Sequence, residues 1–188
     1  MYETGNAHRF FVVTGGPGSG KTSLIDSLEK CGYARTVEAG RSIIRDQVSV
    51  AGPALPWEDR RLFSELMLSW DIRSYRDAEY STGPVFFDRG VPDVLAYLRL
   101  IGLPAPDHMR NAAENLRYHR RVFIAPPWRE IFAQDNERKQ DFDEAVRTYD
   151  SLLSTYSGYG YELVELPRSS VEERAQFVLR QIGVESSR

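Results

Sequence analysis

The sequence is poor in the residues that form covalent or metal cross-links. It contains a single cysteine, Cys31, which excludes an internal disulfide, and three histidines that lack the spacing of a zinc site. Lysine is also rare, because 21 of the 24 basic residues are arginines. The basic residues nearly balance 27 acidic ones, which argues against a broad nucleic-acid-binding surface. We therefore expect no zinc chemistry and no nucleic-acid partner.

Long apolar runs are missing as well. No stretch reaches the roughly 20 apolar residues of a transmembrane helix, and the opening MYETGNAHRF lacks the basic start and apolar run of a secretory signal. We therefore expect a soluble, cytoplasmic protein that does not bind membranes. With 41% hydrophobic residues, a net charge of −3 and 188 residues, the chain fits one globular domain over 1–188.

Two kinds of hydrophobic pattern alternate along the chain, one typical of strands and one typical of helices. Short segments rich in Val, Phe and Ile have the pattern of strands buried on both faces, over residues 9–14, 34–38, 85–88, 121–125 and 161–166. Apolar residues at steps of three and four predict helices over 57–79, 142–156 and 171–182, with Gly158 as a stop signal. Because strands and helices alternate, the sequence predicts an α/β fold with a mainly parallel sheet.

The most specific motif follows the first predicted strand. It fits G-x-x-x-x-G-K-[ST] without departure and leads into an apolar helix pattern. In such a loop, backbone N–H groups approach phosphate oxygens, the lysine reaches the outer phosphates and the threonine hydroxyl holds Mg²⁺. The sequence therefore predicts a nucleotide-binding loop made of Gly15, Gly16, Pro17, Gly18, Ser19, Gly20, Lys21, Thr22 and Ser23.

The end of the third predicted strand indicates which reaction the nucleotide undergoes. Asp88 and Arg89 lie there, at the edge of the sheet where open α/β folds bind ligands. Motor-type ATPases usually follow such an aspartate with a glutamate, and signalling GTPases carry N-K-x-D; neither feature is present. The pair suits phosphoryl transfer to an organic acceptor. The carboxylate takes the hydroxyl proton or holds the metal, while the guanidinium steadies phosphate or substrate.

A second acid and base pair, Glu38 and Arg41, follows the second predicted strand. We expect it to face the same crevice as Asp88, on the acceptor side. Taken alone, Glu38 can also be explained as a negative charge that the dipole of a helix N-terminus favours. Whether Asp88 or Glu38 is the catalytic base stays open. Among nearby aromatic residues, Phe63 and Trp70 fall on an apolar helix stripe, which favours the core over stacking on a ligand ring.

Four features together resemble the P-loop kinase-like AAA domain family: the nucleotide-binding loop, the Glu-x-Gly-Arg motif at 38–41, Asp88 at a strand end, and Pro127-Trp128 after the fourth predicted strand. That family includes ribosylnicotinamide kinase domains, and Asp88-Arg89-Gly90 is similar to nucleoside and nucleotide kinases. The resemblance implies a three-layer P-loop NTPase fold with a five-stranded parallel sheet in the order 2-3-1-4-5. It also implies triphosphate and Mg²⁺ contacts from Lys21 and Thr22, and a lid over about 128–141 that carries Arg138.

We therefore expect a kinase that uses ATP and Mg²⁺ to phosphorylate a hydroxyl of a small, nucleoside-like acceptor. Its expected catalytic residues are Lys21, Asp88 and Arg138, its acceptor residues are Glu38, Arg41 and Arg89, and its metal ligands are Thr22 and Asp88. Two other interpretations stay open: an ATPase or nucleotide switch that acts on a protein partner, and a protein that binds nucleotide without turnover. The acceptor, the choice between ATP and GTP and the oligomeric state, a homodimer included, are not determined by the sequence.

Overall fold

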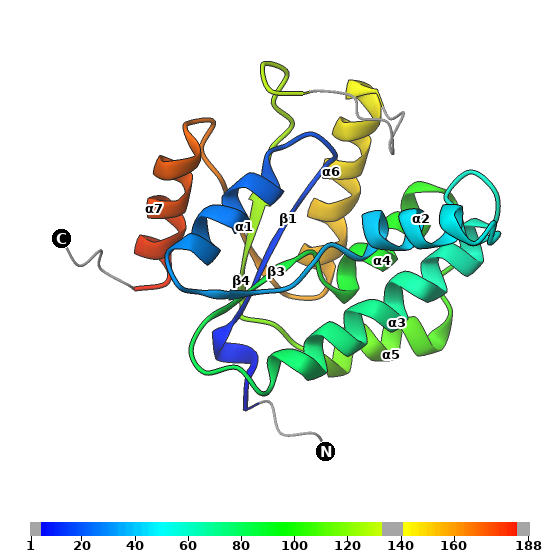
Figure 1. Cartoon of the computed structure of the whole chain (residues 1–188), viewed down its shortest axis with the longest axis horizontal. Helices are drawn as coiled ribbons and strands as arrows, with labels where there is room; N and C mark the ends of the chain where they lie inside the picture. Colours follow the sequence, from blue (N-terminus) through cyan, green and yellow to red (C-terminus); the bar gives the residue numbers. More distant parts are fainter. Residues whose placement is uncertain (1–4, 133–140, 184–188) are drawn as a thin grey trace.

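The computed structural model describes residues 5–132 and 141–183. The strands form one parallel sheet in the order β2-β3-β1-β4-β5, as the sequence predicts (Figure 1). In chain order the elements are η1 Ala7–Arg9, β1 Phe10–Gly15, α1 Lys21–Lys30, β2 Ala34–Arg35, α2 Ala39–Ser49, α3 Arg60–Ala78, β3 Val85–Asp88, α4 Val91–Leu100, α5 Asp107–Asn115, β4 Arg121–Ala125, α6 Phe142–Gly158, β5 Glu162–Glu165 and α7 Val171–Gln181.

Helices cover both faces of the sheet, which gives three layers. In β1, Phe10 and Val12 belong to a core cluster with residues of α3, α4, α5 and α6. Phe11 and Val13 point to the other face and belong to a cluster with residues of α1 and α7. This alternation explains why β1 has no polar face, since side chains on both of its sides are covered by helices.

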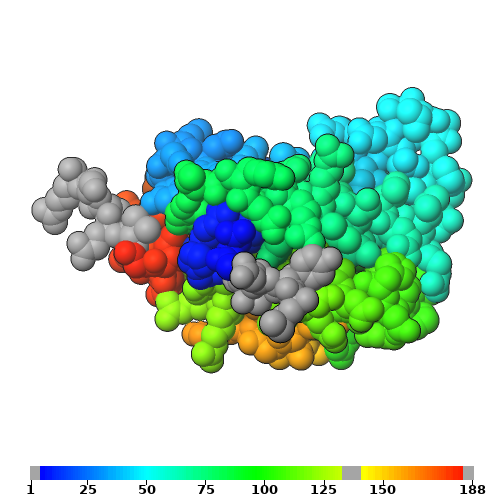
Figure 2. All heavy atoms as spheres, turned by 90° about the horizontal axis from the view of Figure 1, so that it is seen from below, coloured from blue at the N-terminus to red at the C-terminus, as the bar shows by residue number. Residues whose placement is uncertain are grey.

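Helix α2 packs against α3, one of the helices on the face of the sheet that Phe10 and Val12 occupy. Its residues Ile43 and Ile44 pack with Phe63 of α3 and with Leu55 of the connecting loop in a third core cluster. The segment around this loop, drawn in cyan, projects at one corner of the molecule (Figure 2). Helices α2 and α3 thus form a wall beside the carboxyl ends of β2 and β3, where a ligand of an open α/β fold binds.

The predicted boundaries need three corrections. The second strand was expected over 34–38 but β2 ends at Arg35, because Glu38 is already the N-cap residue of α2. The predicted helix from 57 begins only at Arg60, where the Asp59 side chain accepts a hydrogen bond from the Leu62 backbone N–H over 2.9 Å. Gly158 ends α6 from inside the helix and does not follow it. The helices α2, α4 and α5 were not identified from the sequence.

Candidate active site

The predicted nucleotide loop connects β1 to α1. Gly18 and Gly20 have φ angles of 67° and 75°, in the left-handed region that glycine adopts without strain, and Gly20 is the N-cap residue of α1. The Lys21 ammonium donates a hydrogen bond to the Gly16 carbonyl over 2.7 Å, and the Ser19 hydroxyl donates to the same carbonyl over 2.8 Å. The loop therefore forms a compact turn at a helix N-terminus, the arrangement that binds phosphate.

Two elements that are distant in the sequence pack against this loop. A Cβ atom on Gly18 would lie 2.7 Å from the ring of Phe132, and one on Gly20 would lie 2.6 Å from a guanidinium nitrogen of Arg174. Larger residues at these positions would therefore displace their neighbours. The expected lid residue Arg138 lies outside the described residues, as do all positions of the expected lid from 133 to 140.

Arg174 of α7 was not identified from the sequence. Its guanidinium donates hydrogen bonds to the carbonyl of Ser19 over 3.1 Å and to that of Gly20 over 3.3 Å. Burial lowers the pKa of this arginine, and its Nε has no hydrogen-bond partner among the described residues. Arg174 thus holds the nucleotide loop from outside, and no local pattern around residue 174 indicated this contact.

Asp88 lies at the end of β3, next to the nucleotide loop. The residue is only 3% exposed, and its Oδ1 has no hydrogen-bond partner among the described residues. Burial, and then the charge of Glu38, raise the pKa of Asp88 to about 6, against a lowering effect of Lys21. A buried carboxylate oxygen without a partner beside a phosphate-binding loop fits a ligand or an outer-sphere partner of Mg²⁺, together with the Thr22 hydroxyl.

Glu38 and Arg89 form the ion pair that joins the ends of β2 and β3. Arg89 Nε donates to Glu38 Oε1 over 3.0 Å, and Glu38 also lies 3.4 Å from the guanidinium of Arg41. Burial lowers the pKa of Arg89, but the charges of Glu38 and Asp93 outweigh it and raise the pKa overall. The structure therefore places Arg41 and Arg89 around Glu38, with Asp88 close enough for its pKa to respond to Glu38 and Arg89. Their roles toward an acceptor stay a prediction.

Arg89 has an unusual backbone conformation. Its φ angle is 74°, in the left-handed region that a non-glycine residue rarely occupies, and its N–H donates to the carbonyl of Val13 over 3.1 Å. Such strain costs on the order of 1–3 kcal/mol and persists only where surrounding contacts enforce it. Here the ion pairs with Glu38 and Asp93 supply those contacts.

Asp93 is the centre of a buried hydrogen-bond network that the sequence analysis missed. It accepts hydrogen bonds from the hydroxyl groups of Thr14 and Tyr156, each over 2.6 Å, and from Arg89 and the Gly90 backbone N–H, each over 3.0 Å. These partners come from β1, α6 and the start of α4. The only local feature of Asp93 is its place in the first turn of α4, and a capping role explains an aspartate at that position.

A cavity of about 690 Å³ opens beside this network. Its polar wall includes Glu38, Asp71, Arg89 and Asp93, and its apolar wall includes Trp57, Phe63, Met67, Tyr97, Leu100 and Leu152. The volume lies within the usual range of small-molecule sites, about 300–1,000 Å³. Phe63 is buried as expected of a core residue, yet it also lines the cavity.

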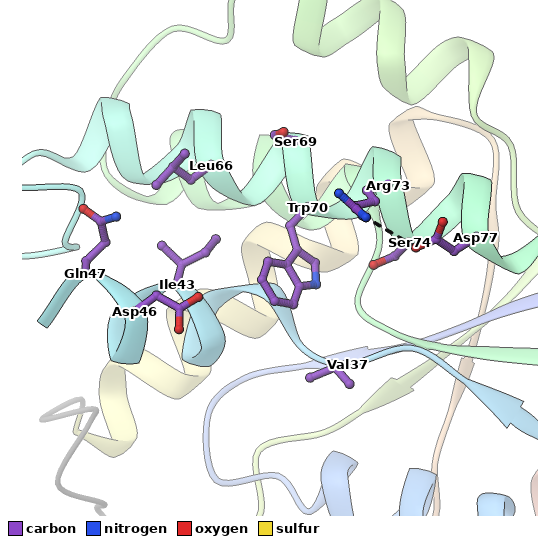
Figure 3. A pocket seen from close by; sticks show the side chains of 10 residues that line it. All are labelled: Val37, Ile43, Asp46, Gln47, Leu66, Ser69, Trp70, Arg73, Ser74 and Asp77. Atoms are coloured by element: carbon purple, nitrogen blue, oxygen red, sulfur yellow. Dashed lines mark ion pairs between the residues drawn. The ribbon is translucent and has the colours of Figure 1, made fainter. Parts of the chain in front are cut away.

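A second hollow, of about 530 Å³, lies between α2 and α3. Its lining includes Ile43, Leu66 and Trp70, and an ion pair of 3.8 Å between Arg73 and Asp77 closes one end (Figure 3). Trp70, expected in the core, is half-buried and points into this hollow. The charged residues that line this hollow, Asp46, Arg73 and Asp77, are exposed, whereas three acids of the first cavity are buried.

Residues 5–132 and 141–183 contain no cluster of three or more His, Cys, Asp or Glu side chains that would hold a metal ion by themselves. Within the same ranges, no helix has both the length and the apolar character needed to cross a membrane. A metal ion at Asp88 and Thr22 would therefore need further oxygen ligands from the nucleotide or from water.

The sheet order, the nucleotide loop and the helices on both faces define the three-layer P-loop fold found in kinases. The chain belongs to the AAA domain family, whose model matches residues 10–174. Comparison with curated protein sequences finds no significant match.

Three solved structures show the same fold. The NadR protein in complex with NR has a TM-score of 0.71 and 17% identity over 96% of this chain and 53% of its own. NadR in complex with NAD and AMP-PNP has a TM-score of 0.70 and 15% identity over 96% and 51%. Deoxyadenosine kinase from M. mycoides, with products dcmp and a flexible dcdp bound, has a TM-score of 0.66 and 10% identity over 92% and 98%. The chain thus spans about half the length of the NadR chains.

Proposed function

We propose that the protein transfers the γ-phosphoryl group of ATP to a hydroxyl group of a small, nucleoside-like acceptor, with the help of Mg²⁺. The observation that carries this proposal is the position of the buried Asp88 and the Glu38–Arg89 ion pair between the nucleotide loop and a cavity of about 690 Å³. The likeness to the NadR protein and to deoxyadenosine kinase supports it.

The two carboxylates take different roles in this proposal. Glu38 lines the cavity and therefore faces the acceptor, whereas Asp88 interacts with Lys21 on the nucleotide side. Glu38 would accept the proton of the attacking hydroxyl, and the new O–P bond forms as the bond to ADP breaks. Bound through Asp88, Thr22 and the phosphate oxygens, Mg²⁺ would neutralise charge on the transferring group.

The cationic side chains complete the proposal. Lys21 would contact the outer phosphates, Arg89 would keep Glu38 oriented, and Arg41 would support Glu38 from α2. The role of Arg138 as a lid residue stays a prediction from the sequence. So do the single domain over 1–188, the cytoplasmic location and the preference for ATP.

The test is ADP release by the purified protein with Mg²⁺ and ATP, alone and with pools of nucleosides, ribosylnicotinamide, sugars and small alcohols. We expect one pool to raise the rate strongly, with a phosphorylated product detectable by mass spectrometry. Fast release without any acceptor would instead support an ATPase or switch, and the absence of any product would contradict a kinase for these acceptor classes. Lys30→Ala is a suitable control for Lys21→Ala, since Lys30 is the exposed last residue of the same helix.

A further inference from the structure

Asp71 is a charged residue at a core position. It lies on the inward stripe of α3 with Leu68 and Tyr75, and only 6% of it is exposed. Its side chain forms no hydrogen bond or ion pair with any other residue that the structure describes. A buried carboxyl group without a partner is costly. A hydrophobic residue would fill this position at lower cost, so packing does not explain Asp71.

The surroundings of Asp71 do not compensate its charge. The charged groups that act on it are Asp93, Arg89, Asp88 and Glu38, three acids and one base. The guanidinium of Arg89 is already paired with both Glu38 and Asp93. Burial, and then the charge of Asp93, raise the pKa of Asp71 well above its usual range. Whether ionised or protonated, its carboxyl group offers at least one oxygen that accepts a hydrogen bond.

Asp71 also lines the cavity that we assign to the acceptor. Glu38 and Arg89 lie on the polar wall of the same cavity. Phe63 and Tyr97 lie on its apolar wall and contact each other edge to face, with ring centroids 5.7 Å apart. A flat ring that packs on these aromatic side chains, with a polar group at its edge, would place that group against the polar wall. A hydrogen-bond donor on a ligand in this cavity would therefore reach the Asp71 carboxyl group.

We infer that Asp71 determines acceptor specificity by binding an N–H group on the ring of the acceptor, so that the substrate class is nucleosides whose ring bears an amino or carboxamide group. This inference rests on the proposed function, because it assigns the acceptor to this cavity. The hydroxyl that receives the phosphoryl group would lie near Glu38, and the N–H group would lie at Asp71.

Binding of matched nucleoside pairs, measured by calorimetry without ATP, tests the inference. The first pair is deoxyadenosine and purine deoxyriboside, which differ only in the 6-amino group, and the second is deoxycytidine and 2-pyrimidinone deoxyriboside. The third pair is ribosylnicotinamide and its 3-acetylpyridine analogue, in which a methyl ketone without an N–H group replaces the carboxamide and the net charge is unchanged. We expect at least one pair to bind with about tenfold or greater preference for the N–H member, because an unmatched buried polar group disfavours the analogue.

Two substitutions assign the preference to this residue. Asp71→Leu, which has a similar size and no acceptor atom, should reduce the ratio of dissociation constants to about one. Asp71→Asn should keep a reduced preference, since its amide carbonyl still accepts a hydrogen bond. Asp77→Leu is the matched control, because Asp77 lies on the same helix but its side chain is 70% exposed and pairs with Arg73 outside the cavity.

The outcomes separate this inference from the kinase proposal. A ratio that Asp71→Leu leaves unchanged, or the absence of binding by every N–H member at millimolar concentration, overturns the role of Asp71. Either result can accompany intact phosphoryl transfer to another acceptor, in which case the kinase proposal stands. Conversely, a preference that depends on Asp71 without any transfer from Mg·ATP would support the binding site and contradict the kinase.

Discussion

The nucleotide half and the acceptor half of the candidate site are built in different ways. The nucleotide half is one uninterrupted segment between β1 and α1, and the groups that we propose bind phosphate there are mainly backbone N–H groups. The acceptor half consists of side chains from α2, α3, α4, α6 and the end of β3. Local backbone conformation therefore determines the first half, whereas tertiary packing determines the second.

The two halves also differ in charge. A helix N-terminus and Lys21 make the nucleotide side positive, as an anionic ligand requires. On the acceptor side, the buried acids Glu38, Asp71 and Asp93 outnumber Arg89, the one cation among the described residues that line the cavity. An acidic cavity disfavours anionic acceptors such as nucleotides and favours neutral or amino-bearing ones. Substitutions on either side should therefore affect different kinetic constants.

The largest effect is expected on the nucleotide side. Lys21→Ala removes the ammonium that would contact the outer phosphates, and we expect kcat/KM to fall about 10³-fold, the upper end for loss of one preorganised donor. Calorimetry should show weakened ATP binding and unchanged acceptor binding. An equal loss of acceptor binding would contradict the separation of the two halves, and Lys30→Ala should behave as the unaltered protein.

Asp88→Asn tests the residue between the two halves. We expect turnover to fall about 10–100-fold, because a neutral amide is a poorer partner for Mg²⁺, with an increase in the Mg²⁺ concentration needed for half-maximal rate. The fold should survive, since a carboxyl that is buried without a partner at Oδ1 does not stabilise it. A near-normal rate would show that Glu38 alone supplies the catalytic carboxylate.

The difference between local conformation and tertiary packing also explains which features could be predicted from the sequence. Four of the five strands, which local patterns predict, are confirmed within about a residue, and the loop from Gly15 to Ser23 also depends on a local pattern. The sheet order, which the family resemblance implies, is confirmed as well. The convergence of Glu38 and Arg89 followed from parallel strand topology, because neighbouring strands end at one edge. Asp93 and Arg174 were missed because their partners in β1, α6 and the nucleotide loop are more than 60 residues away in the sequence. Asp71 was missed because only the fold brings it to the cavity.

The pKa of Asp88 predicts a pH dependence. Below a pKa of about 6 this carboxyl is mainly protonated in the free protein, so kcat/KM should fall about tenfold per pH unit and level off above it. The effect of pH on folding stability has the opposite direction. Because the folded-state pKa lies above the unfolded value of about 3.9, this carboxyl stabilises the fold below about pH 4 and loses that effect as the pH rises through 6.

The pH profile and thermal unfolding of the Asp88→Asn protein check both statements. Its acid limb should disappear or move, and its melting temperature at pH 7.5 should exceed that of the unaltered protein by a few degrees, at about 2–4 °C per kcal/mol for a domain of this size. An unchanged acid limb would assign the titration to another group, with Glu38 as the first candidate.

The smallest catalytic effect is expected from a residue that supports the acceptor side from behind. Tyr156→Phe removes the hydroxyl that donates to Asp93 over 2.6 Å, and loss of a buried hydrogen bond to a charged group costs about 1.5–3 kcal/mol of unfolding free energy. Because Asp93 still binds Thr14 and Arg89, we expect only a few-fold rise in the KM for the acceptor and no change in the KM for ATP.

Tyr149→Phe is the matched control for this substitution. Its hydroxyl donates to Glu165 over the same distance, 2.6 Å, and from the same helix, but at an exposed position away from the cavity. Chemical denaturation should show a smaller loss of stability, since exposed pairs contribute about 0–1 kcal/mol. If Tyr156→Phe changed the KM for ATP as much as that for the acceptor, Asp93 would link the two halves through Thr14 of β1, and they would not be independent.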